Sequence, residues 1–387
     1  MRPEEYGNRE AGQVVHMGTY WAFVPTLPQR VVYDDAMVRL LSEADAALSE
    51  LSGAGRHLPN PHLLIEPYMR REAVLSSKIE GTRTTVAELL MDEFSPGAAG
   101  GDPADVQEVK NYVIALQHGI ELLGSLPLSL RLVREVHRVL MQGVRGSHAT
   151  PGEFRKSQNW IGRAGSTIES ASYVPPPVEY LMDTLGAWEK FLHRREEIPD
   201  LVQCAIMHEH FEAIHPFLDG NGRVGRLLIT LFLMERKRLS QPLLYLSAFF
   251  EGRRDDYYLR LQRVRTQGDW DGWLRFFLQG VVETAREANE GAVKLLHLRE
   301  SIRLDMRDRP KALPLVDQLF INPYMTIVYA AKFLSVTYPT AKGIIEALVK
   351  DGVLTQIASP RAGKMFAAQA ILRTVGGDRE ARRGRHD

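Results

Sequence analysis

The sequence predicts a mostly α-helical protein with one small β-hairpin and a smaller C-terminal unit. Apolar residues recur at helical spacing through most of the first 300 residues, where strand signals are few. Beyond about residue 310 the pattern changes to short helices followed by a second hairpin. A chain of 387 residues is long enough for two or three such units.

Nine segments carry the helical period, each with apolar residues three or four positions apart along one face. In chain order they are 35–51, 64–79, 106–123, 128–142, 180–192, 201–213, 223–238, 257–267 and 270–298.

The segment 159–177 is the marked exception to the helical pattern. The pairs Trp160-Ile161 and Tyr173-Val174 flank a glycine-containing stretch, as in a hairpin with a loose turn. Three consecutive prolines at 175–177 end this segment and begin the next helix.

Composition excludes several classes of protein. Lysine plus arginine and aspartate plus glutamate each number 48, so any nucleic-acid contact must come from a local patch. The only cysteine, Cys204, excludes an intrachain disulfide. There is no apolar signal core at the N-terminus and no apolar run of about 18 residues. We therefore expect a cytoplasmic protein that does not span a membrane.

Residues 215–226 have the sequence H-P-F-L-D-G-N-G-R-V-G-R, which is typical of a loop that opens into a helix. Glycines around Asn221 let backbone N–H groups converge where the helix N-terminus adds partial positive charge, which suits phosphate oxygens. Arg223 and Arg226 share one helix face close to that point. Asp219 offers the hard oxygen ligand that Mg²⁺ prefers beside phosphates.

This stretch is similar to the signature H-x-F-x-[DE]-G-N-G-R-x-x-R of the Fic family, and all eight specified positions agree. Most members of that family transfer AMP from ATP to protein hydroxyls. The resemblance implies that His215 is the general base and that Asp219 holds Mg²⁺. It also implies that ATP phosphates are bound by the following residues: Asn221 with the amides of Gly220 and Gly222 as an anion hole, Arg223, and Arg226 at the terminal phosphate.

A second resemblance lies upstream, where residues 76–81 (S-S-K-I-E-G) fit the family's inhibitory motif [ST]-x-x-x-E-[GN]. Glu80 follows Ser76 by one helical turn, so both side chains face the same way. In relatives this glutamate pairs with the second arginine of the signature and blocks productive placement of the γ-phosphate. The resemblance therefore implies a Glu80–Arg226 pair and an N-terminal inhibitory helix.

Two further site residues follow from the family likeness. The hairpin at 159–173 resembles the flap that aligns a target segment as an added strand, with Ile161 as the clamp residue or as a core residue. Tyr257-Tyr258 resembles a segment of the adenine pocket. Adjacent residues of a helix point in different directions, so we expect Tyr258 to stack on the base while Tyr257 packs inside.

The likeness extends to the flanks and divides the chain. We expect an N-terminal helical segment with the inhibitory motif (1–105), a Fic catalytic domain (106–300), a winged-helix domain (311–375) and a disordered tail (376–387). In the winged helix, 325–334 and 340–350 would be helices and 354–357 with 364–367 the wing, whose tip is 360–364. Its few basic residues, Lys342, Arg361 and Lys364, leave DNA binding and protein docking or dimer support both open.

The expected function is AMP transfer from ATP, with Mg²⁺, to Tyr, Thr or Ser hydroxyls of target proteins and of the chain itself, with autoinhibition by Glu80. One alternative is removal of AMP at the same site, with Glu80 positioning water. A second is a DNA-binding regulator whose Fic domain senses nucleotide, and a remoter one is a UMP or phosphocholine donor. A zinc site at His208, His210 and His215 is disfavoured, because H-E-H-F-E is not H-E-x-x-H.

Overall fold

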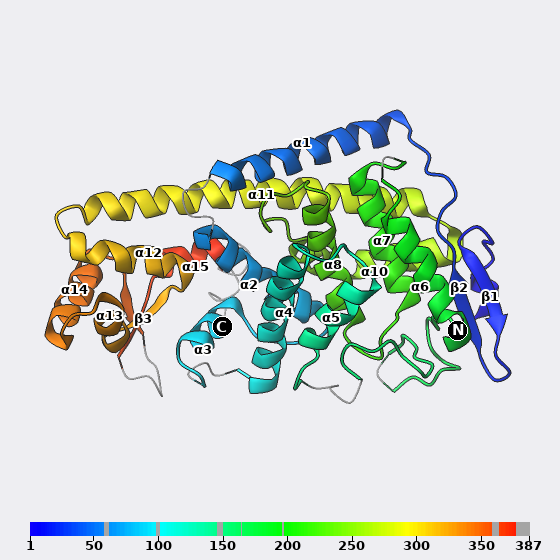
Figure 1. The fold of residues 1–387 in the computed structure, drawn as a ribbon, viewed down its shortest axis with the longest axis horizontal. Coiled ribbons are helices and arrows are strands. Elements are labelled where there is room, and N and C mark those ends of the chain that lie inside the picture. The colour runs from blue at the N-terminus through cyan, green and yellow to red at the C-terminus, as the bar shows by residue number, and fades with distance from the viewer. Residues whose placement is uncertain are drawn as a thin grey trace.

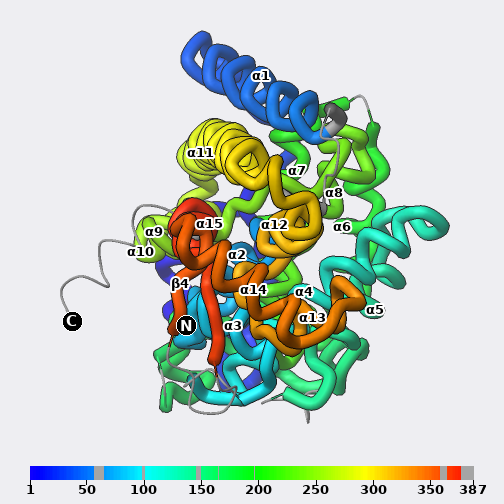
Figure 2. Tube along the Cα trace, turned by 90° about the vertical axis from the view of Figure 1, so that its left-hand side faces the viewer, coloured from blue at the N-terminus to red at the C-terminus, as the bar shows by residue number. Residues whose placement is uncertain are grey.

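The structure, a computed structural model, describes residues 1–57, 62–97, 101–144, 150–163, 165–195, 197–357 and 364–376. The molecule is elongated, and two long helices, α1 (Asp35–His57) and α11 (Trp270–Asp305), lie side by side along one edge (Figure 1). The turned view places α1 outermost, with α11 between it and the other helices (Figure 2).

The predicted helices are confirmed, because each of the nine segments lies largely in a helix. Besides α1 and α11 these helices are α2 (His62–Ile79), α4 (Pro103–Leu122), α5 (Leu130–Leu140), α6 (Val178–Leu192), α7 (Asp200–Ile214), α8 (Asn221–Glu235) and α10 (Arg254–Gln267).

Before the C-terminal unit, two shorter helices were not predicted: α3 (Val86–Phe94) and α9 (Ser247–Gly252). A signal for α3 was present in the sequence, because Thr85 and Glu88 form a capping box at its start. Short 3₁₀ turns add η1 (Pro3–Glu5) and η2 (Pro310–Ala312).

The first residues of the chain correct the prediction of a wholly helical N-terminal segment (1–105). Strands β1 (Gly12–His16) and β2 (Trp21–Pro25) pair antiparallel, with Val14 opposite Phe23. Gly18, at φ +79°, allows the tight reversal between them. Strands of five residues are too short to stand out in a periodicity search, and only Ala22, Phe23 and Pro25 of β2 are fully buried.

The predicted hairpin at 159–177 is also corrected. Its two limbs meet at a single antiparallel bridge between Ile161 and Tyr173, and no longer strand pairing forms in the described residues. Side-chain bonds replace the ladder, because Ser172 Oγ donates to the Ile161 carbonyl at 2.9 Å and Trp160 Nε1 to the Ser166 carbonyl at 3.0 Å. These side-chain hydrogen bonds close the loop although only one backbone bridge joins its two limbs.

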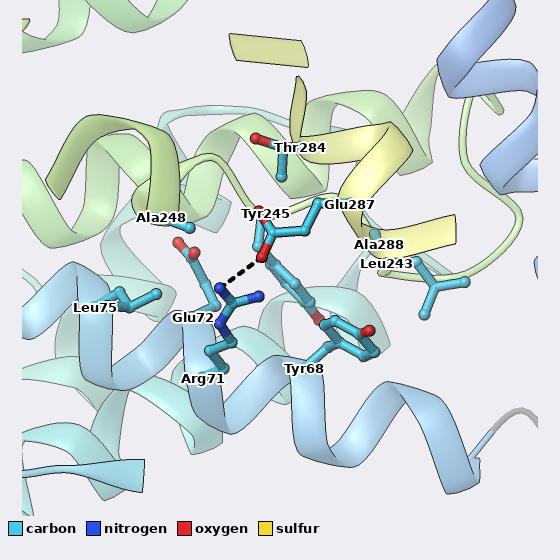
Figure 3. Close-up of a pocket in the computed structure, with 10 residues that line it drawn as sticks. All are labelled: Tyr68, Arg71, Glu72, Leu75, Leu243, Tyr245, Ala248, Thr284, Glu287 and Ala288. Carbon is cyan, nitrogen blue, oxygen red and sulfur yellow. Dashed lines mark hydrogen bonds and ion pairs between the residues drawn. The ribbon is translucent and has the colours of Figure 1, made fainter. Parts of the chain in front are cut away.

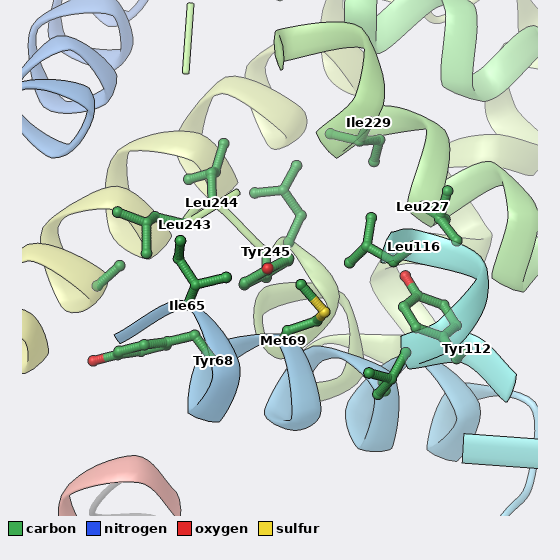
Figure 4. Packing of buried hydrophobic residues seen from close by; sticks show 14 of the residues in the cluster. Ile65, Tyr68, Met69, Tyr112, Leu116, Leu227, Ile229, Leu243, Leu244 and Tyr245 are labelled. Carbon is green, nitrogen blue, oxygen red and sulfur yellow. The ribbon is translucent and has the colours of Figure 1, made fainter. Parts of the chain in front are cut away.

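The core surrounds α7, in which every residue from Leu201 to Ile214 is buried. Helix α2 packs its apolar face against α4, α8 and the segment 243–245, where Met69, Tyr112, Leu227 and Tyr245 interlock (Figure 4). Because α7 and α8 are consecutive and both lie in this core, the loop between them is held at both ends.

The C-terminal unit comprises α12 (Leu313–Ile321), β3 (Tyr324–Thr326), α13 (Ile327–Leu334), α14 (Tyr338–Lys350), β4 (Thr355–Ile357), β5 (Met365–Ala367) and α15 (Gln369–Gly376). The sheet order β3-β5-β4 is antiparallel throughout.

The helices and wing strands predicted for this unit are present, although β3 takes the first residues of the predicted 325–334 helix and α12 was not expected. The winged-helix assignment stays a prediction. Residues 358–363, which include most of the predicted wing tip (360–364), and residues 377–387 of the predicted tail (376–387) lie outside the described residues.

This unit is packed on the rest of the molecule. Helices α12 and α15 lie against α2 and α11, and Asn322 Nδ2 donates to the Leu90 carbonyl at 3.0 Å. Asp317 of α12 pairs with Arg299 at 2.9 Å and with Arg303 at 2.7 Å on α11. Across the described residues, none of the helices has both the length and the apolar character needed to cross a bilayer.

Candidate active site

The loop between α7 and α8 begins at His215, which ends α7 in the left-handed conformation (φ 49°, ψ 60°). Its N–H still donates to the Phe211 carbonyl at 3.0 Å, so the imidazole leaves the helix at a fixed angle. A non-glycine residue rarely adopts this conformation, and such strain persists only where the surroundings impose it.

Two asparagines and one arginine impose that geometry through backbone contacts. Asn221 Oδ1 accepts from the Phe217 N–H and Nδ2 donates to the Phe217 carbonyl, both at 2.8 Å. Asn159 Nδ2 donates to the same carbonyl at 2.8 Å and to that of His215 at 3.2 Å. Arg155 is buried, and its Nε donates to the His215 carbonyl at 3.0 Å. The Asn221 side chain therefore fixes the loop and leaves anion binding to backbone amides.

His137, which the sequence did not single out, supports the loop from α5. Its ring stacks on Phe217 with centroids 3.6 Å apart and planes 5° apart. Nδ1 accepts from the Gly152 N–H at 2.9 Å, so Nε2 carries the proton and donates to the Asp219 carbonyl at 3.1 Å. Burial lowers the pKa of His137 to about 4, which keeps this arrangement neutral.

The His215 imidazole is also neutral at physiological pH. Burial, with the nearby cations Arg265 and Arg155, lowers its pKa to about 4. Nδ1 lies 3.4 Å from the Glu212 carbonyl, which can only accept, so the proton belongs on Nδ1. The lone pair of Nε2 is then available to accept a proton.

The start of α8 presents backbone amides to one point. Gly220 caps the helix at φ 78°, and the N–H groups of the first turn have no carbonyl partner within the helix. A Cβ at Gly220 would lie 2.8 Å from the sulfur of Met141, so only glycine fits between loop and neighbour. This geometry suits an anion at the start of α8.

Two residues give this end its charge. Arg223 is buried, with Nη1 3.1 Å from Glu108 and Nη2 3.6 Å from Asp219. The Asp219 side chain is half exposed at the mouth of the turn. A carboxylate at the mouth of such a turn is a hard oxygen ligand of the kind that Mg²⁺ prefers, so Asp219 is the residue that would hold this ion.

Glu80 and Ser76 converge on Arg226, as the inhibitory motif predicts. Arg226 Nη2 lies 2.7 Å from Glu80 Oε1 and donates to the Ser76 carbonyl at 2.9 Å, while Nε donates to Ser76 Oγ at 2.9 Å. Burial acts to raise the pKa of Glu80, but the Arg226 guanidinium holds it below its ordinary value. Glu80 is therefore ionised and locked to the arginine.

The same carboxylate fills the space above Gly222. A Cβ at Gly222 would lie 2.2 Å from Glu80 Oε1. Glu80 thus sits directly against the amide turn where an anion would approach, and it already carries the negative charge that this end of α8 attracts.

A polar strip on α2 holds Glu80 in this place. Glu72 and Ser76 are buried on one face of α2, and Glu80 follows at the same spacing of four just beyond the end of the helix, with its side chain 34% exposed. Glu72 is buried and accepts from Ser247 Oγ at 2.5 Å and from the Tyr112 hydroxyl at 3.0 Å. Burial raises the pKa of Glu72, whereas the hydrogen bonds from Ser247 and Tyr112 favour its ionised form. The strip anchors α2 to α9 and α4.

Glu72 also borders a small cavity beneath α2 and α11, crossed by the Arg71–Glu287 pair at 2.7 Å (Figure 3). Its volume is about 20 Å³, room for a single water. The lining contains no residue of 215–226, so this cavity is no part of the nucleotide site.

Tyr257 and Tyr258 point in different directions, one inward and one toward solvent, as the helix geometry predicts. Tyr257 is buried and its hydroxyl lies 2.9 Å from His208 Nε2. Tyr258 is 42% exposed, with the Arg254 guanidinium 5.9 Å from its ring centre. Tyr258 is therefore partly exposed and Tyr257 packs inside, and stacking of Tyr258 on a base stays a prediction.

Comparison with known families agrees with this geometry. Residues 38–121 match the family described as "Fic/DOC family N-terminal", and residues 127–233 match "Fic/DOC family". The chain belongs to the Fic family. Its site residues from His215 to Arg226 fall inside the second match and Glu80 falls inside the first.

Two curated relatives of this Fic protein are named "Protein adenylyltransferase Fic". The one from Drosophila grimshawi is 27% identical over 205 residues, covering 51% of this chain and 38% of the relative. The one from Drosophila virilis is 28% identical over 206 residues, with the same two coverages. The chain thus spans well under half the length of these relatives.

Solved structures show the same fold. A Fic family protein from Desulfovibrio desulfuricans aligns with a TM-score of 0.57 and 22% identity, covering 87% of this chain and 97% of that one. A Fic domain containing signaling protein from Bacteroides thetaiotaomicron aligns with a TM-score of 0.53 and 17% identity, covering 65% of this chain and 96% of that one.

The flap of this Fic chain is braced by its N-terminal residues. The Phe23 N–H donates to the Val174 carbonyl at 2.9 Å, so one backbone hydrogen bond ties the return limb of the flap to β2. The Tyr6 hydroxyl donates to the Ser172 carbonyl at 3.0 Å. Ile161, half-buried at the opposite limb, packs against the cluster around Phe23 and Tyr173. Ile161 therefore has a core contact as well as an exposed part.

The three histidines considered for zinc do not converge. His208 uses one ring nitrogen toward the Gly225 carbonyl at 3.0 Å and the other toward Tyr257. Among the described residues, no group of three or more His, Cys, Asp or Glu side chains is arranged to hold a metal ion.

Proposed function

We propose that this chain is a protein adenylyltransferase, which transfers AMP from ATP to a Tyr, Thr or Ser hydroxyl of a target protein or of itself. The observation that carries the proposal is a neutral imidazole, His215, beside a helix N-terminus that holds two arginines and the half-exposed carboxylate of Asp219. The curated relatives named protein adenylyltransferase support the same reaction.

In this reaction the triphosphate lies along the start of α8, with Arg223 and the first-turn amides on its oxygens. The target hydroxyl oxygen attacks the α-phosphorus, and its proton passes to Nε2 of His215. A new P–O bond to the target forms as the bond from the α-phosphorus to the bridging oxygen breaks, and pyrophosphate leaves. Mg²⁺ held at Asp219 supplies charge neutralisation for the triphosphate.

We infer that Glu80 restrains this activity. Arg226 is the cation that would reach the terminal phosphate, and Glu80 already occupies it at 2.7 Å. The Glu80 carboxylate and a γ-phosphate compete for the same guanidinium and repel each other at the same turn. ATP therefore binds productively only when Glu80 has moved away or has been removed.

Intact-mass analysis tests the proposal. Wild type, Glu80→Gly and His215→Ala are incubated with ATP and Mg²⁺, and we expect added AMP chiefly on Glu80→Gly and none on His215→Ala. A chain that gains no AMP in any variant contradicts the transferase proposal. Incubating AMP-modified Glu80→Gly with wild type decides the alternative, because loss of AMP in that mixture favours AMP removal as the main activity.

A further inference from the structure

A groove lies beside the catalytic loop on the surface formed by α5, α6 and the segment 153–156. Its volume is about 600 Å³, within the range of sites that hold several side chains. The walls include the apolar residues Leu130, Phe154, Val178, Leu181 and Met182. Met182 is 57% exposed, so an apolar surface there faces water.

The groove is joined to the catalytic loop through its own wall. Phe154 packs on Phe217 with ring centres 5.2 Å apart, and the Arg155 N–H donates to the Pro216 carbonyl at 2.9 Å. From here the chain continues through Asn159, which bonds the same loop, to Ile161 of the flap. Residues 154–161 therefore form one strip along the loop, with the groove at one end and the flap at the other.

The rim of the groove is mainly positive. Arg131, Arg134 and Lys156 line it, and Glu153 is the acidic residue among its lining. Lys156 pairs with Glu153 at 2.8 Å, and Arg134 donates to the Gly152 carbonyl at 2.7 Å. Arg131 is exposed, and within the described parts of the chain no carboxylate lies in ion-pairing distance of it. The rim therefore has an unused positive charge beside an apolar floor.

We propose that this groove binds an acidic segment of the target protein that also carries apolar side chains. The inference rests on the proposed transferase function, because it names the class of target that the site accepts. The apolar side chains fill the floor between α5 and α6, and a carboxylate meets Arg131 and the rim. An opposite-charge rim favours the correct partner and raises its encounter rate.

The length of the strip 154–161 limits how far apart the groove-binding residues and the modified residue of the target can lie. Eight residues run from Phe154 in the groove wall to Ile161 of the flap, both included, and an extended chain spans at most about 3.5 Å per residue. A target strand at Ile161 with its hydroxyl at His215 therefore reaches the groove within about eight residues of the modified position.

Binding can be measured without catalysis. Full-length His215→Ala is immobilised and exposed to two synthetic peptide pools, each of 15-residue peptides with one central Tyr. The variable positions are Asp, Glu, Leu and Phe in the acidic pool and Lys, Arg, Leu and Phe in the basic pool. A single-stranded DNA of 15 nucleotides is the third probe, and the retained fraction of each is quantified.

We expect selective retention of the acidic pool. Arg131→Glu should lower that retention about fivefold, the effect of one exposed ion pair, and Met182→Asp should lower it further. Matched controls are Lys190→Glu, elsewhere on α6, and Val38→Asp, an exposed apolar position on α1; both should retain the pool as the parent does. Circular dichroism confirms that all four remain folded.

Equal retention of both peptide pools overturns the inference, as does retention of DNA in place of acidic peptide or equal loss in the control variants. A second arm separates this from the transferase proposal, by adding ATP to the Glu80→Gly chain and reading AMP on the peptide Tyr. Selective binding without AMP transfer supports the groove and contradicts the transferase. Transfer to both pools alike supports the transferase and overturns the groove.

Discussion

Glu80 and Arg226, 146 residues apart in the sequence, form an ion pair of 2.7 Å at the N-terminus of α8. The arginine is also bonded twice to Ser76, so one turn of α2 surrounds the guanidinium that would reach a terminal phosphate. Under the proposed function, regulation and phosphate binding would compete for this single side chain.

Because Glu80 and Arg226 share one contact, the effects of their substitutions on AMP transfer should not be additive. Glu80→Gly should raise AMP transfer, Arg226→Ala should abolish it, and the double variant should resemble Arg226→Ala, because both residues act through one contact. Initial rates of AMP transfer from labelled ATP at saturating Mg²⁺ measure this. A double variant as active as Glu80→Gly would show that Glu80 inhibits by a route that does not involve Arg226.

His137 should act as a positioning residue for the loop. His137→Ala removes the stack on Phe217 and the bonds to Gly152 and Asp219, and each lost buried hydrogen bond costs about 1–3 kcal/mol. His137→Phe keeps the stack alone. We expect a higher KM for ATP in both variants, with the smaller loss of folding stability in His137→Phe. A change in stability with an unaltered KM for ATP would confine His137 to a structural role.

The buried histidines predict a distinct response to acid. The folded pKa values are about 4 for His215 and His137 and about 3 for His208 and His210. Unfolded imidazoles take up protons near pH 6.5, so for these groups the unfolded state binds more protons and stability is lost as pH falls from about 6.5 toward 4. Burial raises the pKa of Glu209 and Glu212 to about 7, and these two carboxyls act in the opposite direction, but the four histidines outnumber them. Urea unfolding at pH 7 and pH 5 should show a lower midpoint at pH 5, and His210→Gln should make the pH dependence shallower.

The lowered pKa of His215 also determines how kcat/KM changes as the pH falls. Because the pKa of His215 is about 4, the base stays neutral well below pH 6.5. The kcat/KM of Glu80→Gly should therefore remain nearly constant from pH 7.5 to pH 5.5, wherever the fold survives. A loss of activity centred near pH 6.5 in a folded enzyme would contradict this environment for His215.

The contact between Tyr6 and Ser172 should reduce the mobility of the flap. Tyr6→Phe keeps the ring beside Phe23 and removes the hydroxyl that donates to the Ser172 carbonyl and accepts from Gln262. We expect faster hydrogen exchange at the Ile161 and Tyr173 amides, which form the single bridge of the flap. Tyr180→Phe, at an exposed position on α6, is the control and should leave both amides unchanged.

Any DNA binding by the C-terminal unit should be weak. Lys342 on α14 lies 3.6 Å from Glu346, so part of its charge is already compensated. Three basic residues release few counterions, which limits the log–log salt slope to about −3. Fluorescence anisotropy of the full chain with duplex DNA measures the slope, and a much steeper value would favour the DNA-binding regulator.

The sequence predicted the helices and the signature contacts because both are recorded in short-range patterns. Apolar periodicity located the helices, and the spacing from Ser76 to Glu80 put both side chains on one face of α2. The pairing of that face with Arg226 followed only from resemblance to a family motif.

What the sequence did not predict depends on contacts between distant segments. His137, Arg155 and Asn159 hold the catalytic loop from 56 to 82 residues away, and nothing local distinguishes them from other polar residues. Glu72 carried a weak signal, its spacing of four from Ser76. The β1–β2 hairpin escaped detection because its strands are short and only partly buried.

The position of the isotope in ATP tests the central claim most directly. Glu80→Gly and its His215→Ala double variant are incubated with ATP labelled at either the α- or the γ-phosphate, and protein-bound label is counted. The account predicts stable labelling of Glu80→Gly from the α-phosphate alone and none of the double variant. Label from the γ-phosphate, or equal α-labelling of the two chains, would contradict AMP transfer by His215.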